Sequence, residues 1–231
     1  MPKNLLENEI NLLNGDVSED DSVESKENRL INLESKIEEF AEMSVAKAQL
    51  MLDAGTQYLD FQRNDDAWEY AYASFNCFIK NKEWELAVVA CDIMVSADQK
   101  DSLLALAHGV WLGITYPIAP ETTVAILQHL IDESPVGSET AAVAAVTAYY
   151  IADIRGEGKE GESLKFFTEQ IMGKVAAEHR NVSSQQEFEI WRVGNQFDDP
   201  DSFLPKLSAA IDSLAADNWW FDREKMRSEI F

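Results

Sequence analysis

The chain has 231 residues, 46% of them hydrophobic, and its 42 acidic against 19 basic side chains give a formal net charge of −23. This apolar content supports a substantial core and excludes an intrinsically disordered chain. The negative charge repels DNA, RNA and anionic membranes, so we expect no nucleic-acid or membrane partner, and any protein partner should be neutral or basic. The same charge would equally well serve only to keep a cytoplasmic protein soluble. Few Gly and Pro residues and almost no β-branched alternation favour helices over sheets.

Three features of the sequence indicate a cytoplasmic protein. No apolar run approaches the roughly 18–20 residues that a membrane-spanning helix needs. The N-terminal stretch MPKNLLENEINLL carries acids inside its apolar run, unlike a secretory signal. The two cysteines, Cys77 and Cys91, suit a reducing compartment better than a disulfide framework.

Residues 1–26 are predicted to form a flexible acidic segment that precedes a single helical domain, residues 27–231. Within this segment Leu6, Ile10 and Leu13 fall on one face of a short amphipathic patch. The following stretch, NGDVSEDDSVESK, offers almost nothing to bury and reads as a solvated linker. The patch can be either a docking peptide or a frayed terminus.

The rest of the chain predicts a succession of helices separated by short turns. A long helical pattern opens the domain, and Gly55 is a point at which it can break into two pieces. The glycine-rich stretch GEGKEG at 156–161 is predicted to be a flexible turn, and Ser138 is a predicted N-cap. The predicted helices cover residues 27–63, 65–80, 83–97, 102–116, 122–134, 138–155, 163–179, 184–197 and 202–216.

One 34-residue window, 68–101, contains a helix, a short turn and a second helix. Its second half, NKEWELAVVACDIMVSADQKD, resembles the second half of a tetratricopeptide repeat. Trp84 stands where an aromatic residue opens the second helix, Ala87 takes the small-residue position, and Asp98 falls in the closing turn. A small residue lets two helices approach closely while the aromatic side chain fills the space above it.

The next window continues the resemblance, which covers residues 65–135 with a weaker echo in 138–180. Gly109 occupies the place of the family's first-helix glycine, and Ala125 serves as the small residue of the partner helix. The sequence departs from the family pattern where Phe75, Phe78 and Gln99 replace the usual Gly, Tyr and Pro. The fold class that follows is all-α: antiparallel helical hairpins stacked as a short tetratricopeptide-like α-solenoid, or an irregular helical bundle.

We find no constellation of residues that points to catalysis, a metal or a cofactor, so we expect a protein that is not an enzyme. No histidine has a carboxylate three residues before it, as a helical metal motif would require. Cys77 and Cys91 lack further Cys or His ligands nearby and read as core thiols. Residues 156–159 lack the spacing of a phosphate loop. His108, inside the apolar stretch LLALAHGVW, reads as a core or groove histidine.

The aromatic residues are the most suggestive candidates for binding. Trp219, Trp220 and Phe221 are consecutive and close to the C-terminus, so something must cover them. Either this tail packs back on the last hairpin, or it anchors a partner, as tryptophans at interface hot spots do. We therefore nominate Trp219, Trp220 and Phe221, together with Trp68 and Tyr72, as partner-binding residues.

The function that these patterns favour is a non-enzymatic protein-binding adaptor, assembly factor or chaperone that uses a helical-repeat surface. Acidic side chains would steer a basic partner, and aromatic side chains would supply the short-range binding energy. One alternative is an acidic DNA mimic or inhibitor protein, although the acids are interspersed with lysines. Another is a helical-bundle enzyme, but Asp20-Asp21 falls in the linker and Asp198-Asp199 in a break, so neither pair lies on a helix that lines a cavity.

Overall fold

The computed structural model describes residues 23–229, and every regular element in that range is an α-helix, which confirms the predicted all-α class. The predicted amphipathic patch at Leu6, Ile10 and Leu13 lies outside the described residues. The described helices are α2 (Val23–Glu38), α3 (Val45–Asp60), α4 (Asn64–Asn81), α5 (Trp84–Ser96), α6 (Ser102–Thr115), α7 (Pro120–Asp132), α8 (Glu139–Arg155), α9 (Gly158–Arg180), α10 (Gln185–Gly194), α11 (Pro200–Ala215) and α12 (Arg223–Ser228).

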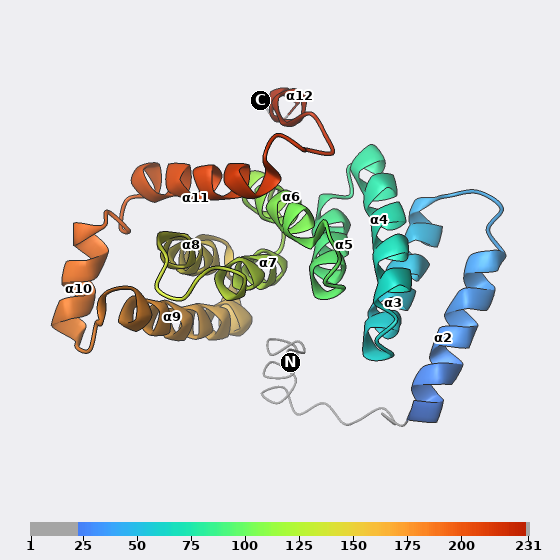
Figure 1. Ribbon diagram of the computed structural model, residues 1–231, viewed down its shortest axis with the longest axis horizontal. Helices are drawn as coiled ribbons and strands as arrows, with labels where there is room; N and C mark the ends of the chain where they lie inside the picture. Colours follow the sequence, from blue (N-terminus) through green and yellow to red (C-terminus); the bar gives the residue numbers. More distant parts are fainter. Residues whose placement is uncertain (1–22, 230–231) are drawn as a thin grey trace.

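The helices stack in chain order along the long axis of the molecule (Figure 1). Each helix from α2 to α9 packs against the next one, and α3, α5, α7 and α9 also contact one another in succession, forming one row. Helices α4, α6 and α8 lie on the other side of this row. At the far end the chain reverses, and α11 runs back across α6 and α8. This return carries the C-terminus toward the middle of the molecule.

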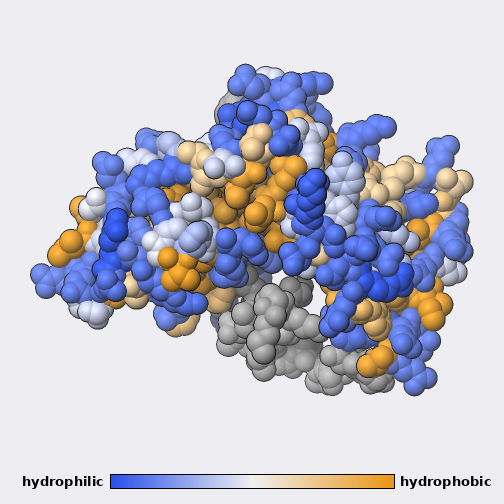
Figure 2. Space-filling view, in the orientation of Figure 1, coloured by the Kyte–Doolittle hydropathy of each residue, from blue (hydrophilic) through white to orange (hydrophobic). Residues whose placement is uncertain are grey.

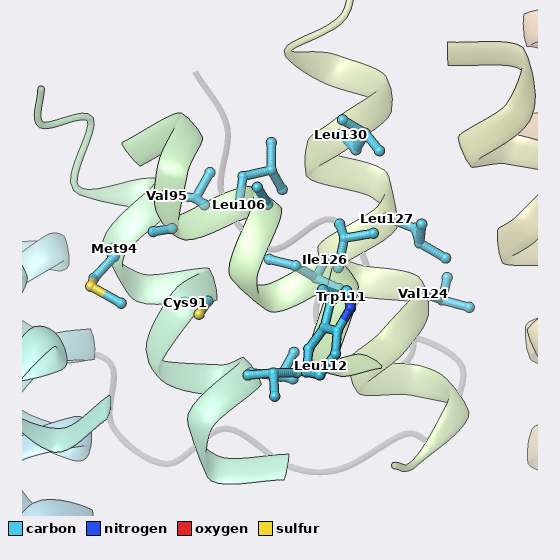
Figure 3. Packing of buried hydrophobic residues seen from close by; sticks show 14 of the residues in the cluster. Cys91, Met94, Val95, Leu106, Trp111, Leu112, Val124, Ile126, Leu127 and Leu130 are labelled. Atoms are coloured by element: carbon cyan, nitrogen blue, oxygen red, sulfur yellow. The ribbon is translucent and has the colours of Figure 1, made fainter. Parts of the chain in front are cut away.

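The centre of the stack is a tightly packed contact between α5, α6 and α7 (Figure 3). Gly109 makes it possible: a Cβ at this position would lie 2.8 Å from Cγ1 of Ile126 and 2.9 Å from Cβ of Cys91. Both distances are shorter than real Cβ atoms show, so only glycine fits. The residue facing Gly109 is thus Ile126, while Ala125 is half-buried beside it.

Three residues that the sequence singles out make specific contacts. Trp84, at the start of α5, stacks on Tyr116 just after α6 with ring centroids 4.2 Å apart. Ala87 is fully buried. The hydroxyl of Ser138 accepts the backbone N–H of Ala141 and caps α8, as expected.

The first predicted helix is interrupted, but not at the expected residue. The chain leaves α2 after Glu38 and re-enters a helix at Val45, with the Ser44 hydroxyl accepting the backbone N–H of Lys47 as the N-cap. Gly55 lies inside α3, where its position faces Ile93 of α5. The last four residues of the predicted linker, 23–26, form the first turn of α2.

The stretch 156–161 is a tight corner and not a flexible turn. Helix α9 begins at Gly158, five residues before the predicted start. A Cβ on Gly161 would lie 2.4 Å from the carbonyl carbon of Gly156, so the two backbones touch. Glycine at both positions therefore lets α8 and α9 join through a very short connection.

Arg155, at the end of α8, ties this hairpin to the preceding one. Its guanidinium donates to the carbonyl oxygens of Gly113 (2.8 Å) and Ile114 (3.2 Å) in the last turn of α6. These carbonyls lack hydrogen-bond partners within their own helix. A positive charge at this end is also favourable, because the C-terminus of a helix carries a partial negative charge. Across residues 23–229, no helix is both long enough and apolar enough to cross a membrane.

Candidate protein-binding surface

A face of α4 and α6 gathers five ring-bearing side chains, and we call this set the aromatic face. Its members are Trp68, Tyr72 and Phe75 from α4, with His108 and Trp111 from α6. On each helix the spacing of three or four residues places these side chains on the same side. Figure 2 shows that polar side chains dominate the surface in this view, with hydrophobic side chains gathered around α6 and its neighbours.

The C-terminal residues 217–229, here called the C-terminal segment, lie against this face. They leave α11 through Ala216 and Asp217, whose φ values of 43° and 68° put two successive non-glycine residues in the left-handed region. Such a conformation costs about 1–2 kcal/mol for each L-residue. The turn redirects the chain so that α12 stands apart from the other helices above α6 (Figure 1).

Trp220 occupies the middle of the aromatic face. Its ring stacks on His108 with centroids 4.3 Å apart, and it meets Tyr72 edge-on at 5.0 Å and Phe75 at 5.4 Å. Trp68 contacts both Tyr72 (6.4 Å) and Trp220 (6.5 Å). Edge-on and offset pairs of this kind contribute about 0.5–1.5 kcal/mol each beyond their buried area.

Phe221 and Trp219 pack on the α6 side of the same face. The ring of Phe221 lies 5.1 Å from His108 and 5.2 Å from Trp111, and Trp219 lies 4.9 Å from His108. The consecutive aromatic run of the tail therefore surrounds His108, which is fully buried.

His108 also fixes the backbone of the C-terminal segment. The backbone N–H of Trp220 donates to Nε2 of His108 at 2.8 Å, and Nδ1 lies 2.6 Å from the carbonyl oxygen of Leu104. The carbonyl can only accept, so the proton resides on Nδ1 and the ring is the neutral tautomer. Burial, assisted by the charge of Arg223 and opposed by the bond to Leu104, lowers the pKa of His108 from 6.5 to about 4.

Charged contacts hold the two ends of the C-terminal segment. Arg223 lies over the Trp219 ring at 3.8 Å and pairs with Asp212 of α11 at 2.6 Å. At the other end Glu229 pairs with Lys82, after α4, at 2.7 Å. These pairs are exposed to solvent, which screens their charges, so they position the segment more than they stabilise it.

One buried donor on the aromatic face is left unpaired. Trp111 is 97% buried, since its relative exposure is 3%, and no acceptor among residues 23–229 pairs with its Nε1–H. The groups of the C-terminal segment that lie against its ring are the side chains of Trp219, Phe221 and Arg227. None of these side chains is an acceptor, and an unpaired buried N–H costs about 1–3 kcal/mol.

All five nominated residues therefore meet at one place. The C-terminal segment does pack back on the protein: its aromatic run contacts α4 and α6, and Arg223 pairs with Asp212 of α11. The aromatic run reaches these earlier helices because α11 returns along the stack. Tyr72 remains 39% exposed and the other four are half-buried. Phe75 and Trp111 were not among the predicted binding residues, although ring-bearing side chains at helical spacing were a signal for them. His108 was predicted to be a core or groove histidine, and it is fully buried.

Elsewhere, an acid and a histidine form a partly buried pair away from this face. Asp92 of α5, an acid inside an apolar stretch, accepts a hydrogen bond from His129 of α7 at 2.8 Å. Burial lowers the pKa of His129, but the hydrogen bond and charge of Asp92, with the charges of Asp132 and Glu133, outweigh burial and raise it above 6.5. No third ligand joins them: within residues 23–229 no group of three His, Cys, Asp or Glu side chains is placed to hold a metal ion.

The chain has no significant match among protein-family models, curated proteins or solved structures.

Proposed function

We propose that the protein is a non-enzymatic binding module, an adaptor, assembly factor or chaperone, that holds a peptide segment of another protein on its aromatic face. The observation that supports this is the way in which the face holds the protein's own C-terminal segment. Trp220 is enclosed by Tyr72 and Phe75 of α4 and by His108 of α6, and its backbone N–H is bound at the same time. Ring contacts combined with a main-chain hydrogen bond are a usual means of recognising an extended peptide.

The repeat-like arrangement of the hairpins supports the same proposal. In our reading, α4 with α5 and α6 with α7 are two degenerate tetratricopeptide-like hairpins, with Gly109 as the close-packing residue. Stacked hairpins of this kind present a continuous row of helices on which a partner can lie. Here α11 packs on α6 and α8, and the C-terminal segment packs on α4 and α6, so the returning chain covers this side of the hairpins.

The charge of the molecule supports a neutral or basic partner. A formal net charge of −23 accelerates encounters with positively charged proteins and slows encounters with nucleic acids. The aromatic rings would then provide the binding energy at close range.

Affinity capture with three versions of the full chain tests the proposal. The baits are the natural sequence, Tyr72→Ala on the aromatic face, and Phe166→Ala as a matched control, since Phe166 is an exposed aromatic residue of α9 away from this face. We expect at least one partner that the natural chain and Phe166→Ala retain equally and that Tyr72→Ala retains about tenfold less, the effect of losing roughly 1.4 kcal/mol. Circular dichroism would verify that all three baits are folded. Identical protein sets on all three baits would contradict the proposal.

A further inference from the structure

We infer that the C-terminal segment, residues 217–229, is a displaceable internal ligand, and that the partner's binding segment repeats its chemistry: adjacent aromatic residues followed by an arginine. This inference rests on the proposed function and specifies the partner. The partner segment would place its rings between Tyr72 and His108, offer a backbone N–H to His108, and supply an acceptor to Trp111.

The contacts of the C-terminal segment are those of a bound peptide and not those of a core helix. Three consecutive aromatic residues make the ring contacts, and one backbone N–H is bound by the His108 side chain. The six-residue helix α12 that follows has no buried residue. The ring contacts of the segment thus come from a short motif near its start, while its far end is held by the solvent-exposed ion pair between Glu229 and Lys82.

Two features make this internal ligand imperfect and therefore displaceable. Its entry turn holds Ala216 and Asp217 in the left-handed region, which L-residues adopt at a cost. It also covers Trp111 without pairing its Nε1–H. A partner segment is free of the turn and can bring a carbonyl or carboxylate oxygen to that donor, so it can compete although it is not covalently attached.

The charges around the face favour an aromatic segment that carries arginine. The carboxylate of Asp212 forms an ion pair with Arg223, whose guanidinium also lies over the Trp219 ring. The guanidinium of Arg227 lies 5.6 Å from the centre of the Trp111 ring. A partner with an arginine two or three residues after its aromatic pair would reproduce the pairing with Asp212.

A synthetic peptide with the sequence of residues 217–229, labelled with a fluorophore, is the direct probe. It would be titrated by fluorescence anisotropy into the full natural chain and into the full-chain variant Trp220→Ala, whose own segment loses its central ring. We expect the peptide to bind Trp220→Ala at least tenfold more tightly than the natural chain, because the intact internal segment competes at a high effective concentration. Binding should fall at least tenfold for the double variant Trp220→Ala/Tyr72→Ala, and for a peptide with alanine at positions 219 and 220.

Hydrogen exchange of the natural chain provides a second measurement that needs no variant. We expect the amides of residues 217–229 to exchange much faster than those of α6, and excess unlabelled peptide to speed their exchange further while α4 and α6 stay protected. Exchange of the segment at the same rate as α6, or an absence of peptide binding to a folded Trp220→Ala, would overturn the inference. So would a dimer of the natural chain that the peptide dissociates, since the occupant would then be the segment of a second copy.

These results are separable from those that test the proposed function. If a cellular partner is lost with Tyr72→Ala but the peptide does not displace the segment, the binding module stands and the internal ligand is a fixed part of the face. If the peptide binds but no partner depends on Tyr72, the segment is displaceable and the proposed function fails.

Discussion

His108 is the residue on which the C-terminal segment most directly depends, because it serves only in its neutral form. Its Nε2 accepts the backbone N–H of Trp220 while its ring stacks on the Trp220 side chain. A proton on Nε2 would remove the acceptor and place a charge in a fully buried site.

This arrangement predicts an acid-labile attachment. The pKa of His108 is about 4 in the folded chain and 6.5 ordinarily. Between pH 4 and pH 6.5 the histidine is therefore protonated in the unfolded chain but neutral in the folded chain. Stability from this group is complete above pH 6.5 and is lost as the pH falls toward 4, by about 3 kcal/mol in total. Urea unfolding at pH 7 and pH 4 would measure this loss. The comparison is His108→Gln, which lacks the titrating imidazole, so only the pH dependence of stability is compared between the two chains. An equal loss in both chains would contradict the prediction.

Replacing Gly109, which follows His108 in the chain, with alanine should destabilise the protein, although this substitution usually stabilises a helix. Glycine to alanine in a helix normally stabilises by just under about 1 kcal/mol. At Gly109 the new methyl group would overlap Ile126 and the Cβ of Cys91, at a cost of about 1–3 kcal/mol that offsets or exceeds this gain, so we expect a net loss of up to about 2 kcal/mol.

Gly173, in α9, is the matched control, since nothing lies within 4 Å of a Cβ placed there. Gly173→Ala should gain about 0.5–1 kcal/mol. Chemical denaturation of both variants gives the two values, and stabilisation by Gly109→Ala would show that α5, α6 and α7 are less closely packed than described.

At the scale of elements, the turn after α11 decides where the C-terminal segment lies. Ala216 ends this helix in a left-handed conformation, with its N–H donating to the carbonyl of Asp212. Helices commonly end in this way, but usually with glycine, because a Cβ strains the backbone there. The chain accepts this strain at Ala216 and again at Asp217, and the contacts of the aromatic run offset it.

Replacing Ala216 with glycine should therefore stabilise the protein by about 0.5–1 kcal/mol. The comparison is Ala209→Gly at an exposed position within the same helix, which should lose about 1 kcal/mol. Thermal or urea unfolding measures both changes. Losses of equal size at the two positions would mean that Ala216 is held in an ordinary helical conformation.

At the scale of the whole molecule, the return of the chain determines what the surface presents. Successive hairpins extend the stack in one direction, and α11 then crosses α6 and α8, so the C-terminal segment reaches helices that precede it by more than a hundred residues (Figure 1). The side of the hairpins that carries α4, α6 and α8 is consequently occupied by the protein's own chain. A partner that uses this side must compete with that chain.

The sequence by itself determined the helical class and most of the helix positions from α4 to α8, because hydrophobic periodicity, caps and prolines act within a few residues. It also singled out Trp68, Tyr72 and the run from Trp219 to Phe221, because large aromatic side chains need cover. It predicted a possible break at Gly55, where the structure has a continuous helix. It also predicted a flexible turn at 156–161, where the structure has a tight corner. In both cases the effect of a glycine depends on the neighbour that it faces.

Only the tertiary structure decided that these aromatic residues meet, and that they meet around His108. The contact between Trp220 and α4 joins positions about 150 apart in the chain, and no local pattern encodes such a pairing. It results from the stacking of all the hairpins between them and from the direction in which α11 returns. The neutral state of His108 follows from the same cause, since burial on all sides arises only when α4, α6 and the C-terminal segment come together.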